Sequence, residues 1–332
     1  MILIKKTQRF LRFMSSMKIG LSLLAVIGLL AAIGSGISTD KYYQALPFKV
    51  ILGLLLLNMA LCTTNQVTKF FKHGLKAEKS SQILLRQIGM MTLHAGVVFI
   101  LIGGSVYSFQ GESTQIKIDQ GQTVDMKTIF NQTKPFMIKL DDFNIDFNAD
   151  GSPSQYFSHI SLVENGAVTG EKDISVNNPF EYAGIKAYQS SFGYGVELQG
   201  ESNTGWKEKK TLQESEFLQI PGTDKAIRIY KYIPNFDPEY GMQSKTLRPD
   251  NPRIVYSLYQ KGSLLDVGAV SFGEKVEIQP GTTVQFNGVK PFSVLTVKRD
   301  PGLSLAMAGM LMLMAGTCLT LFLKQKKTGV VQ

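Results

Sequence analysis

Residues 87–107, QIGMMTLHAGVVFILIGGSVY, form a run of 21 residues without acid, lysine or arginine. A helix of this length crosses the hydrocarbon core of a bilayer, and Tyr107 closes the run as interfacial aromatic residues do. The run contains one histidine, His94. An imidazole in lipid costs free energy unless it has a partner, a water-filled cavity or a ligand. The run therefore predicts a membrane span and makes His94 the first candidate for chemistry.

Three further apolar runs predict membrane-spanning helices at about residues 19–37, 48–64 and 302–323. A cleaved signal peptide requires a shorter apolar core, so we expect the first run to be retained. The chain then has three parts. Residues 1–108 form an N-terminal membrane region with three helices, residues 109–300 form a polar domain, and residues 301–332 form the fourth helix and a basic tail.

The basic residues indicate how these spans are oriented. Residues 1–18, residues 64–87 and the tail after Leu323 carry net charges of +5, +4 and +3, so the rest of a chain of net charge +9 is acidic by 3. Basic loops stay in the cytoplasm. We therefore expect a multi-pass protein of the bacterial cytoplasmic membrane, with both termini and a basic loop at 65–86 inside and the domain 109–300 exported. This distribution argues against nucleic-acid binding.

The exported domain has the pattern of β-structure. Its apolar residues alternate with period two, as half-buried strands require, in segments 114–119, 136–140, 226–233, 253–259, 275–279 and 292–298. The pairs Asp150-Gly151, Asn165-Gly166, Lys261-Gly262 and Asn287-Gly288 predict hairpin turns. We expect an all-β antiparallel, sandwich-like domain between the third and fourth helices.

The cysteine and histidine residues of this chain do not form a recognisable catalytic or metal site. Cys62 and Cys318 both lie in apolar runs, so the exported domain has no cysteine for a thiol-redox site. Three histidines do not make a clustered metal site. We expect His159 to lie on the rim of a sheet, and His73, among lysines, to lie in a solvated loop or to gather anionic groups.

Two hypotheses account for His94. In the first, a neutral imidazole ties neighbouring helices together by a hydrogen bond, with Asn58 and Thr63 of the second span as candidate partners. In the second, the imidazole is an axial ligand of haem iron. A single histidine supplies one strong ligand, so a second would come from another protein. Arg86 and Lys79, at the predicted cytoplasmic end, would then attract the haem propionates.

The exported domain contains a motif that is similar to a family signature. In residues 176–195, VNNPFEYAGIKAYQSSFGYG, an asparagine–proline pair precedes an aromatic residue, a glycine and a Tyr-Gln-Ser-Ser run. This pattern resembles the ResB family of cytochrome c biogenesis proteins. Two further stretches agree, RPDNPRIVYSLYQKG (248–262) and VLTVKRDPGLSLAMAGMLML (294–313). The residues that carry the motif are Asn178, Pro179, Tyr182, Gly184, Tyr188, Gln189 and Ser190.

The resemblance implies a subunit of a haem-export and cytochrome c haem-ligation complex, with a ResC/CcsA-type membrane partner. The complex would move haem b across the membrane and present it to the CxxCH thiols of apocytochrome c. His94 matches the family's transmembrane haem ligand. The chain would be a non-catalytic or co-catalytic subunit, because the tryptophan-rich haem-handling segment belongs to the partner and this chain has one tryptophan.

The motif also has an interpretation that needs no family. Pro179 would end a strand, Gly184 would permit a tight turn, and the aromatic residues would pack at the base of the domain. We favour this packing role over contact with a partner. The rival hypothesis for the whole chain is a membrane-anchored β-sandwich that binds or senses an exported ligand and has no role with haem. We also expect the small residues Gly89, Ala95, Gly96, Gly103 and Gly104 to let another helix or a flat macrocycle approach closely.

Overall fold

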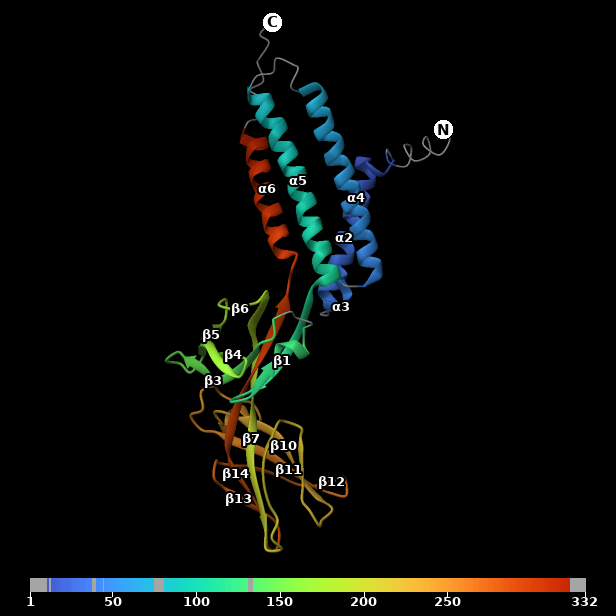
Figure 1. The fold of residues 1–332 in the computed structure, drawn as a ribbon. Helices are drawn as coiled ribbons and strands as arrows, with labels where there is room; N and C mark the ends of the chain where they lie inside the picture. Colours follow the sequence, from blue (N-terminus) through green and yellow to red (C-terminus); the bar gives the residue numbers. More distant parts are fainter. Residues whose placement is uncertain are drawn as a thin grey trace. The chain divides into compact units, whose positions relative to one another are not determined.

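The computed structural model describes residues 11, 13–37, 40–43, 45–74, 81–130 and 134–322. The chain divides into two compact units, one formed by residues 1–113 with 299–332 and the other by residues 114–298. The first unit is helical, and the second is built of β-strands (Figure 1).

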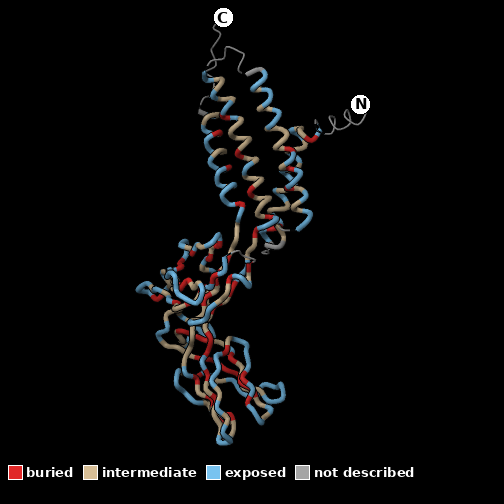
Figure 2. Tube along the Cα trace, in the orientation of Figure 1, coloured by how far each residue is buried: buried red, intermediate tan, exposed pale blue. Residues whose placement is uncertain are grey.

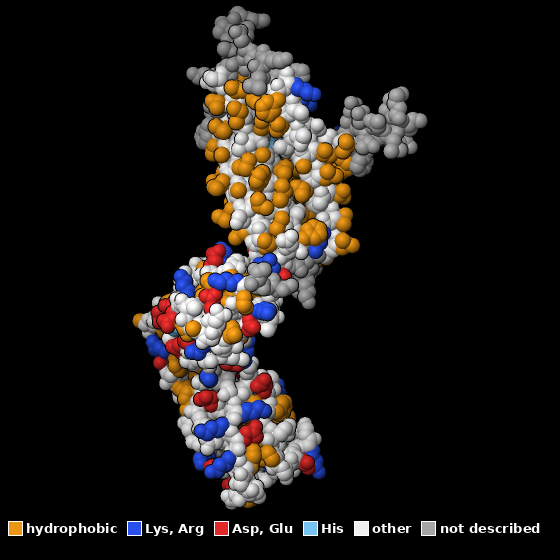
Figure 3. Space-filling model, in the orientation of Figure 1, with side chains coloured by type: hydrophobic (Ala, Val, Ile, Leu, Met, Phe, Trp, Pro, Cys, Tyr) orange, Lys and Arg blue, Asp and Glu red, His pale blue; other side chains and the backbone are white. Residues whose placement is uncertain are grey.

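Four helices of the first unit are long and apolar enough to cross a bilayer. They are α2 (Met17–Ile37), α4 (Leu46–Lys69), α5 (Ser81–Gln110) and α6 (Leu303–Phe322); the short α3 (Asp40–Tyr43) follows α2. Hydrophobic side chains cover the helices on the face shown in Figure 3. Few helical residues are buried within the protein (Figure 2), as expected where lipid covers the helices. The four predicted apolar helices are confirmed.

Helices α4 and α5 extend beyond their apolar runs. Pro47 lies in the first turn of α4, where its missing N–H has no helical partner to lose. The helix continues through Asn65–Lys69 into the π-helical turn η1 (Phe70–Gly74), and α5 already begins at Ser81. The prediction of a loop over residues 65–86 is therefore wrong for residues 65–74 and 81–86, which are helical. Residues 75–80 lie outside the described part of the chain. Gln, Lys and Arg are good helix formers, so polarity alone does not end a helix.

Glycines bring α5 and α6 into backbone contact. Three glycines of α5 recur every seven residues and meet three similarly spaced glycines at α6, in the pairs Gly89/Gly316, Gly96/Gly309 and Gly103/Gly302. Seven residues return nearly to the same helix face, so the two rows stay opposed along the whole contact. The prediction that small residues let another helix approach closely is confirmed for Gly89, Gly96 and Gly103, and that helix is α6 of the same chain.

We predict that Gly96→Leu weakens the helix pair. A Cβ at this position lies 2.6 Å from the backbone nitrogen of Leu313, which cannot rotate away. Overpacking of this kind costs about 1–3 kcal/mol, so the midpoint of thermal unfolding in detergent should fall by several degrees. Gly104→Leu is the matched control, since a Cβ there meets nothing within 4 Å. Equal midpoints for the two variants would contradict the glycine contact.

The β unit consists of three sheets. A six-stranded sheet has the order β1-β14-β7-β6, with β13 beside β14 and β8 beside β7; two four-stranded sheets have the orders β2-β3-β4-β5 and β12-β11-β10-β9. All pairs in the four-stranded sheets are antiparallel. The expected antiparallel β-structure is confirmed. The strands are β1 (Glu112–Asp119), β2 (Thr123–Asp125), β3 (Met137–Phe147), β4 (Pro153–Glu164), β5 (Ala167–Ser175), β6 (Phe180–Tyr182), β7 (Ile185–Ser202), β8 (Lys207–Leu212), β9 (Phe217–Gln219), β10 (Lys225–Ile233), β11 (Arg253–Gln260), β12 (Ser263–Val270), β13 (Lys275–Gln279) and β14 (Thr282–Arg299).

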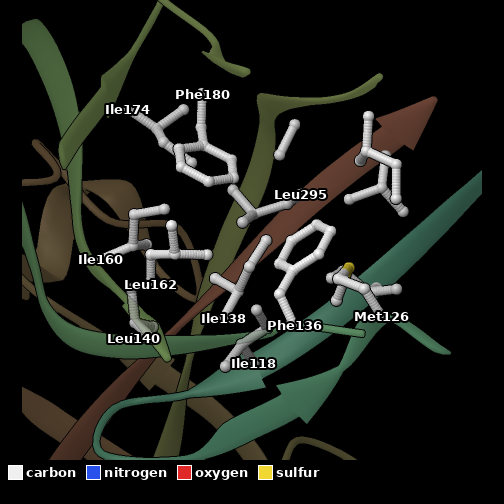
Figure 4. Packing of buried hydrophobic residues seen from close by; sticks show 14 of the residues in the cluster. Ile118, Met126, Phe136, Ile138, Leu140, Ile160, Leu162, Ile174, Phe180 and Leu295 are labelled. Atoms are coloured by element: carbon white, nitrogen blue, oxygen red, sulfur yellow. The ribbon is translucent and has the colours of Figure 1, made fainter. Parts of the chain in front are cut away.

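Two hydrophobic cores lie within this unit. The first contains the start of β7 and the end of β14, with residues such as Ile138, Ile160 and Leu295 packed together (Figure 4). The second contains the end of β7 and the start of β14, including Leu198 and Phe286. The two 18-residue strands therefore run through both cores in opposite directions. The unit is thus a pair of sandwiches that share their longest strands.

Three of the four predicted turns join adjacent strands. Asn165-Gly166 connects β4 to β5 and Lys261-Gly262 connects β11 to β12, and all four residues have positive φ, as the tight hairpin turn requires. Asp150-Gly151 lies between β3 and β4, with Gly151 at φ +81°. The turn predicted at Asn287-Gly288 is wrong, since this pair lies inside β14. Pairing of β14 across both cores overrides the local preference of the dipeptide.

Candidate functional site

His94 lies on the face of α5 opposite the glycine row. Its Nδ1 is 2.8 Å from the carbonyl oxygen of Met90 one turn earlier. A carbonyl only accepts hydrogen bonds, so Nδ1 carries the proton and Nε2 holds the free lone pair. The amide nitrogen of Gln66, on α4, lies 3.3 Å from that Nε2 and donates to it. The imidazole is therefore held between two helices, with Nδ1 on the carbonyl of Met90 and Nε2 directed toward Gln66 of α4.

Gln66 is the helix partner that the sequence analysis missed. Asn58, one expected partner, is 1% exposed and donates instead to the carbonyls of Met14 and Ser16. Thr63, the other, donates to the carbonyl of Met59 in its own helix at 2.8 Å. Both assignments are therefore wrong. They assumed that α4 ends near residue 64, which leaves Gln66 in a loop.

A cavity of about 580 Å³ opens beside His94 in the helical unit. Its walls come from α2, α4 and α5, and the residues on them are Ser15, Met17, Gly20, Leu21, Leu24, Leu55, Asn58, Met59, Cys62, Asn65, Gln66, Lys69, His94, Val97 and Leu101. The volume lies in the range of small-molecule and cofactor sites, which are mostly apolar with a few convergent polar groups. Gln66 adds one unusual feature, because its Oε1 is buried without a hydrogen-bond partner.

The polar residues of the cavity form a stripe along α4. Asn58, Cys62, Asn65 and Lys69 follow one another at intervals of four, three and four residues. That spacing places them on one helix face. A search for helical period in the polar residues as well as the apolar ones would have found the stripe. Two sulfur-bearing side chains, Met59 and Cys62, also line the cavity together with His94.

Arg86 lies eight residues before His94 on α5, outside the cavity lining. Its Nε is buried without a hydrogen-bond partner. Lys79 and the side chain of His73 lie outside the described residues. Within the described part of the chain, no three His, Cys, Asp or Glu residues gather as a metal site would require.

The residues of the Val176–Gly195 motif lie in the β unit. Asn178 exchanges backbone hydrogen bonds with Ser175, closing a tight turn in which Pro179 follows directly. Gly184, at φ +79°, forms the turn between β6 and β7 together with Ala183, at φ +49°. The tight turn predicted for Gly184 is confirmed. Positive φ is costly for alanine, so the surrounding strands hold this turn in place.

Gln189 joins three strands at the junction of the two cores. Its Oε1 accepts hydrogen bonds from Ser158 of β4 at 2.6 Å and Ser293 of β14 at 3.1 Å, and both serines are fully buried. Ser190 accepts from Gln115 of β1, whereas Tyr188 is 37% exposed. Buried polar groups of this kind are stable only when paired. The Gln-Ser part of the motif thus connects strands.

Tyr182 belongs to a charged cluster on the same unit. Its hydroxyl donates to Glu164 at 2.8 Å, and Lys134 lies 3.2 Å from the same carboxylate. The ring of Phe136 packs against Tyr182 edge to face at 5.1 Å. Hydrogen bonds from Tyr182 and Lys134 lower the pKa of Glu164 below its ordinary value of 4.5, against the opposing effect of burial.

His159 is bonded on the surface of β4, as the rim position predicts. Its Nδ1 lies 2.5 Å from a carboxylate oxygen of Asp173 on β5, and its ring stacks on Phe157. Its side chain is 37% exposed. This geometry accounts for His159 as a cross-strand pair.

We predict that Glu164→Gln makes the β unit less sensitive to acid. A carboxylate with a lowered folded-state pKa stabilises the fold above its unfolded pKa, and that contribution is lost as pH falls through the folded value. Wild-type protein should therefore lose stability below about pH 4.5 more steeply than the variant, as followed by Trp206 fluorescence in chemical unfolding at each pH. Glu171→Gln is the control. Parallel curves for Glu164→Gln and wild type would contradict the assignment.

Comparison with known proteins identifies relatives across most of this chain. A model of the ResB-like family matches residues 75–279 and 239–331. The cytochrome c biogenesis protein CcsB of Picosynechococcus sp. (strain ATCC 27264 / PCC 7002 / PR-6) is 26% identical over 266 residues, which cover 76% of this chain and 54% of that protein. CcsB of Synechococcus sp. (strain RCC307) is 28% identical, with coverages of 72% and 52%. The chain spans about half the length of the curated relatives it matches.

Among solved structures, that of the cytochrome c haem lyase CcmF is similar to this chain. It covers 90% of this chain and 34% of that protein, with 9% sequence identity and a TM-score of 0.33. A similarity of this size supports no inference about fold or function.

Proposed function

This chain belongs to the ResB-like family, and from that premise we propose that it acts in cytochrome c biogenesis as a haem-handling membrane subunit. Its relatives carry the name of that process. The observation that carries the proposal is the position of His94 at the wall of the 580 Å³ cavity, with its Nδ1 held by the carbonyl of Met90 and its Nε2 engaged only by the side chain of Gln66. Haem is here the cargo of the complex.

The residues around His94 fit an iron ligand. Histidines that bind metals usually donate their other ring N–H to a carbonyl or carboxylate, which fixes the ring and raises its basicity. The Nδ1–Met90 contact of 2.8 Å is such a bond. The cavity is apolar along α2 and polar near Asn65 and Lys69, matching a macrocycle with charged carboxylates at one edge. His94 would hold the iron, and Lys69, which lines the cavity, would meet a propionate.

We propose that Arg86 is a second cation that attracts the haem propionates. Its unpartnered Nε offers a donor toward an anionic group, although the residue is not on the cavity wall. Lys69 takes the first role because it lines the same cavity as His94.

Gln66 would act as a latch on the iron ligand. In the structure its amide N–H occupies the lone pair of His94, so the amide has to move away before that nitrogen can bind iron. Its orphaned Oε1 lowers the cost of this movement, because the present position leaves a buried acceptor without a partner. The sulfur atoms of Met59 and Cys62 line the same cavity. We propose that the second strong ligand comes from a ResC/CcsA-type partner.

The wider arrangement follows from charge. We propose that both termini and the basic region 64–87 face the cytoplasm and that residues 114–298 are exported, because the excess of basic residues lies in the termini and in residues 64–87. The complex would then join haem b to the CxxCH thiols of apocytochrome c outside. The contribution of this chain is positional: it holds haem where a partner can deliver thiols, which turns an encounter into a nearly intramolecular reaction.

The hydrogen bond between Gln66 and His94 also supports a second candidate function. If the Gln66–His94 contact serves only to tie α4 to α5, the chain is a membrane-anchored module whose sheets bind an exported ligand without haem. The two functions predict different haem content for the His94→Ala variant and different haem affinity for the Gln66→Ala variant.

His94→Ala should remove haem from the purified complex. Loss of the ligand nitrogen should lower haem content at least tenfold and abolish the spectrum of the ligated iron, by analogy with the 10–100-fold losses seen even for outer-shell partners. The measurement is haem per protein by absorption in detergent, with and without the partner. His159→Ala, a histidine of the β unit, is the control. Retention of wild-type haem content and spectrum by His94→Ala would refute the ligand assignment.

Gln66→Ala should strengthen haem binding. The variant removes a hydrogen bond worth about 0.5–1.5 kcal/mol that competes for Nε2, so the dissociation constant should fall roughly two- to tenfold. Haem titration of the full chain followed by absorption measures this, with Asn65→Ala, a neighbouring cavity residue, as the control. A variant with lower thermal stability and unchanged haem affinity would favour the tie between helices.

A further inference from the structure

The β unit contains a second cavity, of about 340 Å³, whose walls are largely aromatic. Four rings line it, from Phe192 and Tyr194 of β7, Tyr232 of β10 and Phe292 of β14. The rest of the lining is Gly193, Gln213, Glu214, Pro234 and Leu247. Phe192 and Tyr194 belong to the end of the Val176–Gly195 motif, which no step of the proposed function uses.

The rings are held at steep angles to one another. Tyr194 and Tyr232 have centroids 5.0 Å apart at an interplanar angle of 65°, and Phe192 and Tyr194 lie 5.9 Å apart at 87°. Other rings cover part of this aromatic surface, because Phe192 stacks on Phe143 at 5.2 Å and Tyr232 stacks on Phe272 at 6.1 Å. Gly193 contributes by having no side chain, because a Cβ there would collide with the ring of Phe292. The four rings, called the cage here, line the cavity with their remaining surface.

Glu214 adds a negative charge to the cage. Its Oε1 accepts a hydrogen bond from the backbone N–H of Tyr232 at 3.2 Å, which fixes the carboxylate at the cavity wall. Across the described residues, no lysine, arginine or histidine forms an ion pair with it. Burial raises the pKa of Tyr194 and of Tyr232, so both phenols stay neutral at physiological pH.

We propose that this cavity binds an ammonium group on an alkyl arm, the lysine side chain of an exported polypeptide. Ring faces attract cations through their quadrupole, and aromatic cages are the usual receptors for such groups. Phe292 already shows this affinity, because the ammonium of Lys117 lies 4.3 Å from its ring centroid. The carboxylate of Glu214 supplies the compensating charge that a partly desolvated ammonium requires.

The source of the ammonium group follows from the surface around it. The β unit carries both signs of charge on the face shown in Figure 3, as expected for a surface in water, and we take a polypeptide in water rather than a lipid headgroup as the source. The polypeptide source rests on the proposed function, in which this unit is exported and meets apocytochrome c. The cation chemistry rests on the cavity alone.

The test is peptide binding by the full-length protein in detergent. The probe is a capped Gly-Gly-Lys-Gly-Gly peptide, with the same peptide carrying Nε-acetyllysine as its uncharged match, measured by saturation-transfer NMR and titration calorimetry. Wild-type protein should bind the lysine peptide and not the acetylated one. Glu214→Gln should weaken binding about tenfold, as expected for a cation–π site that loses its carboxylate. Glu216→Gln, two residues away and outside the cavity, should bind normally.

Two outcomes overturn the proposal. Equal binding of both peptides would exclude cation recognition, and stronger binding of phosphocholine than of lysine peptide would assign the cavity to a lipid headgroup. Gln213→Lys, which introduces a competing ammonium at the cavity wall, should also abolish binding and guards against a folding defect in Glu214→Gln. His94→Ala should retain peptide binding, so loss of haem and loss of peptide report on separate proposals.

Discussion

The backbone contact between α5 and α6 constrains the rest of the chain. Where Gly103 meets Gly302, the helix that precedes the sheets lies against the one that follows them. The inserted segment of residues 114–298 therefore starts and ends at neighbouring points, as an insertion between two packed helices must. Lipid supplies no hydrophobic force to join these helices, so close packing of small residues has to do so. The same contact occupies one face of α5 and leaves His94 on the other.

Satisfaction of polar groups then organises the free face of α5. His94, Met90 and Gln66 form a chain of hydrogen bonds in which every nitrogen of the imidazole is used. The side-chain amide of Asn58, on α4, likewise donates hydrogen bonds to the carbonyl oxygens of Met14 and Ser16, which precede α2. The resulting cavity is bounded by three helices and retains one unpaired oxygen, on Gln66.

Much of this architecture could be predicted from sequence, for identifiable reasons. Long apolar runs and period-two alternation are properties of single segments, so the four helices were predicted, together with six of the strands, β1, β3, β10, β11, β13 and β14. Asn165-Gly166 succeeded because both residues adopt the left-handed conformation that the turn needs. Asn287-Gly288 failed because long-range pairing of β14 decided its conformation. Gln66 was missed for a related reason, since its role depends on a helix end and on a partner 28 residues away. The glycine row was recognised as small, but which helix it faces is a tertiary property.

The shared strands β7 and β14 have a consequence for how this protein is made. β14 supplies residues to both cores, and it is the last strand of the unit to leave the ribosome. Neither sandwich can complete its core until that strand is present, so the earlier strands, from β1 at Glu112 onward, have exposed edges until the chain is synthesised as far as Arg299. Once β14 arrives it closes both cores together. The sheets are therefore built to mature in one late, cooperative step, immediately before α6 pairs with α5.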